Sequence, residues 1–245
     1  MRIEDRTRTY TIAMERTVVP ENFSFRMTDE EYRVLEKIKN SIPVCYLADH
    51  ADFALGIVTG NNKKFLSAEK TENSEMVLKG TDICKYHINP VKQYLRFEPE
   101  QFQQVAPLEI YRAPEKLLYR FISNQLVVAY DDRQMLSLNS CNIVIPKIAG
   151  MQIKYILAIL NSSVSQFVYQ KEFHSIKVLR AHMEHIPIPR VGKAIQNEII
   201  AMTEPLICGM GKEAAETCQK RLDCRIMDLF RLSAEEQWII RHALH

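Results

Sequence analysis

The sequence predicts an α+β fold in which a twisted mixed or antiparallel sheet carries packed helices and is followed by a helical C-terminal region. Short apolar runs separated by turn residues occupy the middle of the chain. An apolar pattern with spacings of three and four residues comes next, and helical periodicity dominates after Gly192. These patterns divide the chain into a lead-in with one helix (1–43), a central sheet region (44–190) and a helical region (191–245).

A capping box at Thr28 and Glu31 marks the start of the first helix. In this motif the threonine hydroxyl accepts from the third amide of the helix, and the glutamate reaches back to the cap. Apolar residues then recur at helical spacing up to Pro43, which stops the helix. We expect residues 1–25 to form an extended lead-in whose order depends on packing against another element.

The central region contains four candidate strands. Residues 53–58 have the composition of a buried strand that runs into a polar loop. Residues 117–122 and 126–130, joined by three polar residues, give the clearest hairpin signal in the chain. Residues 143–145 predict one more short strand, which Pro146 stops.

A single long helix is predicted after these strands. Apolar residues recur from Ile153 to Val168 with spacings of three and four, which indicates an amphipathic helix of about five turns that ends near Lys171. The polar stretch 173–180 comes next. The prolines at 187 and 189 then fix an extended exit from the central region.

The C-terminal region predicts helices with breaks at Gly209, at Gly211 and near Arg231. A second capping box, Ser233 with Glu236, starts a short final helix. A stripe close to a heptad seam runs through this region at Ala215, Cys218, Leu222, Ile226 and Leu229. Such a stripe is typical of a packed core, and docking against a partner helix is the alternative.

Composition sets the class of protein. Apolar residues make up 47% of the chain and charged residues 25%, as in ordinary globular proteins. No apolar run reaches the roughly 18 residues of a membrane helix, and the charged N-terminus lacks the apolar stretch of a signal peptide. We therefore expect a cytoplasmic location with no membrane contact.

Cysteine and histidine spacing predicts neither disulfides nor a metal site. The six cysteines are widely separated and form no C-x-x-C pair, which is typical of small, mostly buried thiols in a cytosolic protein. His182 and His185 form an H-x-x-H, but no further cysteine or carboxylate completes a zinc site. We expect no metal and no cofactor.

Charge is unevenly distributed, although the net charge is only +2. Residues 112–193 contain eleven Lys and Arg against five Asp and Glu, an excess of +6, so the rest of the chain sums to −4. A basic face on an otherwise neutral protein, as in nucleic-acid-binding proteins, gives such an asymmetry. A solvated surface with chance clustering accounts for the counts equally well.

Catalytic motifs of DNA-modifying enzymes are absent from the sequence. A DNA methyltransferase that acts on an amino group needs a tetrapeptide like N-P-P-Y and a Gly-rich loop that binds the methyl donor. Residues 89–92 share only two letters with the tetrapeptide. Many nucleases use an Asp followed by E-x-K to hold magnesium, and no E-x-K triplet occurs. The doublet Asp131-Asp132 predicts a turn after the hairpin. With no G-x-S-x-G and no P-loop either, we predict no catalytic residues.

An ordered set of short motifs runs from residue 116 to residue 189: Lys116–Ser123, Ala129–Asp132, Leu138–Ser140, Leu160–Ser162, Lys177–Leu179 and Ile186–Pro189. In this order they resemble the TaqI-like C-terminal specificity domain. Segments 56–62 and 229–236 resemble the family too, so the resemblance covers residues 44–245. This module follows the catalytic domain in many type IIG restriction enzyme–methyltransferases and is related to the target recognition domains of type I specificity subunits.

The resemblance implies that residues 44–190 recognise a sequence in double-stranded DNA. The chain would then position the duplex for a methyltransferase or endonuclease domain that this sequence lacks, supplied either by a longer polypeptide or by a separate subunit. The alternative is a protein-interaction module that docks a methyltransferase subunit, or that forms a homodimer, through its C-terminal helices.

Candidate DNA-contacting residues follow from side-chain chemistry, because Lys and Arg neutralise phosphates while Asn, Gln, Ser and Arg read base edges in the major groove. The candidates are Thr59, Asn61, Asn62, Lys63, Lys64, Arg112, Lys116, Arg120, Arg133, Asn139, Asn142, Lys171, His174, Lys177 and Arg180. A surface turn explains the composition of the 59–64 loop as well. Arg120, inside a strand, could be a structural ion-pair partner, and Asn139 and Asn161 could fix turns or caps.

Overall fold

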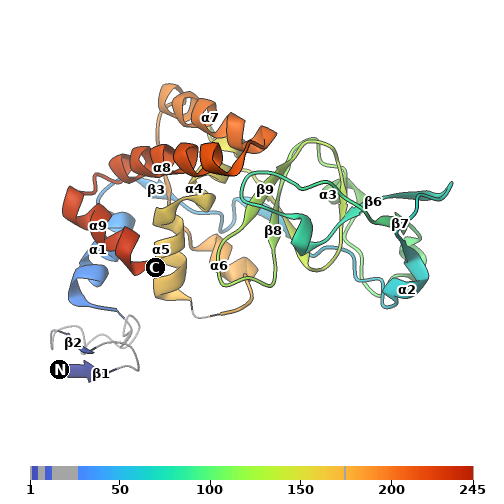
Figure 1. Cartoon of the computed structure of the whole chain (residues 1–245), viewed down its shortest axis with the longest axis horizontal. Coiled ribbons are helices and arrows are strands. Elements are labelled where there is room, and N and C mark those ends of the chain that lie inside the picture. Colours follow the sequence, from blue (N-terminus) through green and yellow to red (C-terminus); the bar gives the residue numbers. More distant parts are fainter. Residues whose placement is uncertain (1, 5–8, 13–26, 174, 245) are drawn as a thin grey trace.

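A computed structural model of the chain describes residues 2–4, 9–12, 27–173 and 175–244. The predicted α+β fold is confirmed: most helices gather at one end of the molecule and the strands extend towards the other (Figure 1). The helices are α1 (Asp29–Asn40), α2 (Asn62–Phe65), α3 (Leu108–Tyr111), α4 (Ile153–Asn161), α5 (Ser163–Glu172), α6 (Arg180–Glu184), α7 (Lys193–Cys208), α8 (Lys212–Leu229) and α9 (Ala234–Ala243).

The strands are β1 (Arg2–Glu4), β2 (Thr9–Thr11), β3 (Val44–Cys45), β4 (Ala51–Ala54), β5 (Leu66–Ser67), β6 (Ser74–Leu78), β7 (Tyr94–Arg96), β8 (Lys116–Arg120), β9 (Val128–Asp131), β10 (Leu136–Ser137), β11 (Cys141–Pro146) and β12 (Ile188–Pro189). Short 3-10 helices lie at η3 (Gly80–Asp82) and η4 (Pro99–Gln101). None of the helices in the described part of the chain is both long and apolar enough to cross a membrane.

Two four-stranded sheets form the framework of the described residues. The central sheet has the order β4-β11-β8-β9 with every neighbour antiparallel. The second sheet has the order β10-β6-β7-β5, and its β10–β6 pair is parallel. Because β10 leads into β11 after a short turn, it ties the two sheets together. The second sheet and α2 lie at the end of the molecule opposite the helices (Figure 1).

The predicted hairpin is confirmed as β8 and β9, in which Leu118 lies opposite Ala129. The strand predicted at 53–58 is only partly correct, because β4 starts earlier and ends at Ala54. The chain leaves the strand at Gly56, whose backbone packs so closely on Leu138 that a Cβ would lie 2.1 Å from the Leu138 carbonyl oxygen. Only glycine fits this contact.

The helix predicted over residues 153–171 is two helices, α4 and α5, which meet at Ser162. Ser162 has extended backbone angles, and its hydroxyl accepts from the Ser165 amide as the N-cap of α5. Both helices contribute side chains to the same core, so the apolar spacing continues across the break. Periodicity alone therefore predicted one element.

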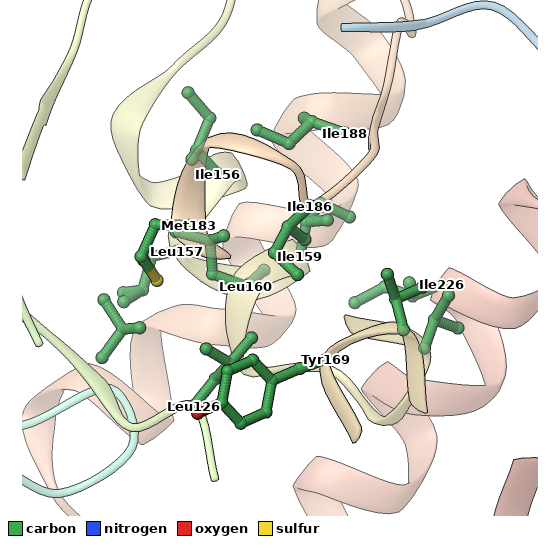
Figure 2. Close-up of a cluster of buried hydrophobic side chains, with 14 of the residues drawn as sticks. Leu126, Ile156, Leu157, Ile159, Leu160, Tyr169, Met183, Ile186, Ile188 and Ile226 are labelled. Atoms are coloured by element: carbon green, nitrogen blue, oxygen red, sulfur yellow. The ribbon is translucent and has the colours of Figure 1, made fainter. Parts of the chain in front are cut away.

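The larger core lies where α4 and α5 meet the exit segment and the C-terminal helices. Figure 2 shows side chains from these elements, from α6 and from the segment before β9 in one cluster: Leu126, Ile156, Leu157, Ile159, Leu160, Tyr169, Met183, Ile186, Ile188 and Ile226. The C-terminal apolar stripe belongs to this core, because Leu222 and Ile226 are fully buried and the other stripe residues pack against the cluster. A second, smaller core lies around Val77, Leu118 and Ile143.

Local signals at helix ends are confirmed. Both capping boxes are formed, at Thr28 and at Ser233. The breaks at Gly209 and Arg231 have positive φ angles of 77° and 54°.

Most of the expected lead-in lies outside the described residues. All six cysteines are free, but the expectation that most are buried holds fully only for Cys45 and Cys141.

Two amide side chains close the β9 edge of the central sheet. Asn161, the last residue of α4, accepts from the Val128 amide at 3.1 Å and donates to the Val128 carbonyl at 2.8 Å. Gln166 of α5 makes the same pair of bonds with Leu126, at 3.2 and 3.0 Å. The backbone of Tyr86 also pairs with this edge, at Val128 and Tyr130. Since buried backbone groups need partners, the two amide side chains, which we call the amide clamp, complete the edge and join the sheet to the helices.

A buried ion pair links β8 and β9. Lys116 Nζ lies 2.6 Å from Asp131 Oδ2, and both side chains have no exposed surface. Lys116 also donates to the Tyr111 carbonyl, while Asp131 accepts from the amides of Arg133 and Met135. Burial lowers the pKa of Lys116, and the neighbouring Asp131 carboxylate opposes that shift. Asp131 ends β9, and its bond from the Arg133 amide, two residues on, forms the turn predicted after the hairpin.

Replacement of Lys116 by methionine tests this structural role. We expect Lys116→Met to lower the free energy of unfolding by about 3–5 kcal/mol, because the Asp131 carboxylate stays buried without its counter-ion. Urea denaturation measures the change. Lys63→Met, at an exposed lysine, is the matched control and should stay within about 0.5 kcal/mol of the original protein. Equal stability of both variants would contradict the structural role.

The close approach at Gly56 gives a second stability prediction. A Cβ there would lie 2.1 Å from the Leu138 oxygen and 2.7 Å from the Cys141 oxygen, both backbone atoms that cannot rotate away. We expect Gly56→Ala to destabilise the protein by about 3 kcal/mol or more, measured by urea denaturation. Gly192→Ala, where nothing lies within 4 Å of the added Cβ, should cost less than about 1 kcal/mol. Similar costs for both variants would rule out the tight contact.

Candidate nucleic-acid interface

The polar loop at residues 59–64 forms the short helix α2. Asn61 caps this helix, since its Oδ1 accepts from the Lys64 amide at 3.2 Å. The Thr59 hydroxyl donates to Asn62 Oδ1 at 2.6 Å and holds the start of the loop. Residues 60–64 are exposed, so the loop presents two amide groups and two lysines to solvent.

A second polar segment, Gln101–Gln104, lies beside this loop. The backbones of Val58 and Gln104 exchange two hydrogen bonds, at 2.9 and 3.1 Å. Lys64 Nζ donates to Gln101 Oε1 at 2.7 Å, and Gly60 packs next to the Cβ of Gln103. We call residues 59–64 and 101–104 together the amide edge. The glutamines were missed in the sequence, where only the run Gln-Phe-Gln-Gln could have indicated an exposed polar surface.

A groove runs from the amide edge along β4, the open edge strand of the central sheet. It has a volume of about 610 Å³, and its lining includes Phe53, Leu55, Gln104 and Arg180. The Arg180 guanidinium lies 5.2 Å from the centre of the Phe53 ring and pairs with Glu184 at 2.7 Å. Hydrogen bonding to Glu184 raises the pKa of Arg180, which therefore stays charged.

Lys177, three residues before Arg180, lies against the end of β8. Its backbone pairs with Ile122, and its ammonium lies 5.8 Å from the centre of the Phe121 ring. Ile122 and Ile176 are exposed here by 53% and 71%, so the surface is both basic and apolar. His174, also a candidate, lies outside the described residues. We call the amide edge, the β4 groove and residues 177–180 the recognition face.

Three predicted DNA contacts are corrected because their side chains are buried. Lys116 has no exposed surface and forms the ion pair with Asp131. Asn142 is 1% exposed, and its Oδ1 accepts from the Gly56 amide at 3.2 Å. Thr59 is 4% exposed and fixes the loop from inside. A duplex cannot reach these groups, so each has a structural role instead.

Three more candidates are occupied by contacts within the protein. Arg112 pairs with Glu75 at 2.6 Å, and Arg120 donates to the carbonyls of Gly80 and Ile83. Lys171 pairs with Glu31, and both side chains are less than 10% exposed. Arg120 therefore has a structural role, as the alternative predicted, but its partners are backbone carbonyls and not the carboxylate of an ion pair. Arg133 and Asn139 are exposed on the loops after β9 and β10.

The face offers hydrogen bonds and positive charge. Within the described part of the chain, no three His, Cys, Asp or Glu side chains are placed to hold a metal ion. His182 of the H-x-x-H caps α6 by accepting from the Leu179 amide at 3.2 Å, and burial lowers its pKa. Amide donors and acceptors with flanking cations are the groups that contact base edges and phosphates.

Solved restriction–modification proteins are similar to this structure. The type IIL enzyme MmeI, in complex with DNA, matches 82% of this chain and 35% of its own length, with 9% identity and a TM-score of 0.56. The type IIG restriction endonuclease BpuSI matches 89% of this chain and 32% of its own, with 13% identity and a TM-score of 0.51. The HsdS subunit from Thermoanaerobacter tengcongensis matches 88% and 50%, with 15% identity and a TM-score of 0.43.

The chain thus spans about a third of the first two proteins and half of the third. At these identities the likeness to MmeI and BpuSI shows a shared fold. No curated protein sequence matches the chain. The family model of the TaqI-like C-terminal specificity domain matches residues 75–188, which include the hairpin, the clamp at Asn161 and the exit strand. Over these residues, just under half of the chain, the protein is similar to TaqI-like C-terminal specificity domains.

Proposed function

We propose that this chain reads a DNA sequence for a restriction–modification enzyme and positions the duplex for a methyltransferase or endonuclease domain that it does not itself contain. The recognition face carries this proposal, because exposed amides and Arg180 lie along the open β4 edge, with the exposed Lys177 three residues before Arg180. The match of residues 75–188 to the TaqI-like C-terminal specificity domain supports it, as does the likeness to MmeI, which was solved with DNA. The matched structures are two to three times longer, which leaves room for such a domain.

The proposed mechanism divides the face by chemistry. Lys63 and Lys177 are exposed cations placed at its two ends, and with Arg180 they would neutralise phosphates. The amides between them would contact base edges. Residues 44–190 would form the recognition region of a cytoplasmic protein, and the chain would act by binding alone. Base flipping and methyl transfer, or cleavage, would belong to the partner domain.

A second candidate function, docking of a methyltransferase subunit, has one supporting observation. Trp238 of α9 is 56% exposed and stacks on His242 with ring centres 3.8 Å apart. Exposed tryptophan is enriched at protein interfaces. The stripe on α8 is occupied within the chain, so a partner or a second copy would have to use α9 instead. Size measurement of the original chain and Trp238→Ala, each mixed with the cognate methyltransferase subunit, would test this role.

Salt dependence tests DNA binding. Three phosphate contacts predict a slope of about −2.7 in log affinity against log salt, or roughly a 40-fold loss between 50 and 200 mM salt, because each contact releases counterions. Lys63→Ala and Lys177→Ala should each reduce the slope by about one unit in gel-shift titrations on random duplexes. Lys212→Ala, at an exposed lysine of α8, is the control and should not change it. Absent or salt-independent binding would refute the proposal.

A further inference from the structure

We propose that Gln103 and Gln104 read adenine bases in the DNA target. This inference rests on the proposed function and names two specificity-determining residues within the recognition face. It follows from three properties of the segment: a backbone fixed against the loop, side-chain amides without a hydrogen-bond partner among the described residues, and two nearby cations, Lys64 and Arg96, that already have partners.

The backbone of the segment is held from both sides. Gln104 exchanges two hydrogen bonds with Val58, and Gln103 lies against Gly60. The residue before them, Phe102, packs edge-to-face on Phe65 at 5.1 Å. Both glutamines therefore extend from an anchored backbone. A binding group on a fixed backbone loses less entropy when it meets its ligand.

The two amide groups are free to bind. Both side chains are exposed, and neither makes a hydrogen bond to any described residue. The rest of the amide edge is different, because Gln101 accepts from Lys64 while the oxygens of Asn61 and Asn62 accept within the loop. Gln103 and Gln104 alone within this edge keep the complete donor and acceptor pair of the amide.

The chemistry of that pair favours adenine. A glutamine amide can donate to adenine N7 and accept from the adenine N6 amino group at once, whereas guanine presents two acceptors that suit Arg or Lys. Two of the cations near the segment already have partners, since Arg96 pairs with Glu98 and Lys64 bonds to Gln101, and the proposed function assigns the third, Lys63, to a phosphate. One amide–adenine pair discriminates against other bases by roughly 5- to 150-fold.

Selection from a pool of random duplexes tests the inference, because the bound fraction reveals the target sequence directly. The original chain should enrich a motif that contains adenine. Gln103→Ala and Gln104→Ala should each flatten one adenine position, by roughly 5- to 150-fold in relative affinity. Gln103→Arg and Gln104→Arg should change the same position from adenine towards guanine, which a merely structural residue would not do.

Gln125→Arg is the matched control, because Gln125 is an exposed glutamine that lines a different cavity, beside α5 and α8. Its motif should equal that of the original chain. If the original chain enriches no motif, the proposed function fails. If it enriches a motif that the variants at 103 and 104 leave unchanged, only the present inference fails. Loss of binding to all sequences, with unchanged thermal unfolding, would likewise overturn adenine reading.

Discussion

The amide clamp on β9 determines how the sheet and the helices fit together. An edge strand exposes backbone groups that need partners, and here Asn161 and Gln166 satisfy those of Val128 and Leu126. Two residues five positions apart in one straight helix would point about 140° away from each other. The break at Ser162 removes this conflict, because α5 starts in a new direction with its own cap. The backbone groups of Val128 and Leu126 therefore both find side-chain partners because the helix is interrupted at Ser162.

With β9 closed by helices, the opposite edge at β4 remains open, and the groove and the amide edge lie along it. Most residues that carry the family resemblance belong to the framework, although residues 59–62 and Lys177–Leu179 lie on the recognition face. Lys116 and Asp131 form the buried pair, and the Ser140 hydroxyl accepts from the Gly80 amide. The motifs thus identify the family because they build its framework, and they indicate little about the contacts of one particular member.

Features with local causes could be predicted from the sequence. The hairpin, both capping boxes and the breaks near Gly209 and Arg231 depend on residues close in the chain. Features with long-range causes could not. The end of β4 depends on Leu138, and the amide edge depends on pairing between Val58 and Gln104, which are 46 positions apart. Residue type alone also gave wrong contact predictions. Lys116 was predicted to contact DNA because it is a lysine, but its side chain is buried in the sheet and pairs with Asp131.

The separation of framework from face has an energetic consequence. Removal of one partner from a buried pair such as Lys116–Asp131 costs several kcal/mol, a large part of the net stability of a domain. Substitutions at exposed side chains such as Gln103 usually change stability by less than about 0.5 kcal/mol. Under the proposed function, residues that read DNA can therefore be exchanged almost independently of folding, while the backbone beneath them stays fixed by Val58 and Phe65. Such a protein can then acquire a new DNA target by exchange of a few surface residues, because its folding depends on buried contacts and its recognition of DNA depends on exposed side chains.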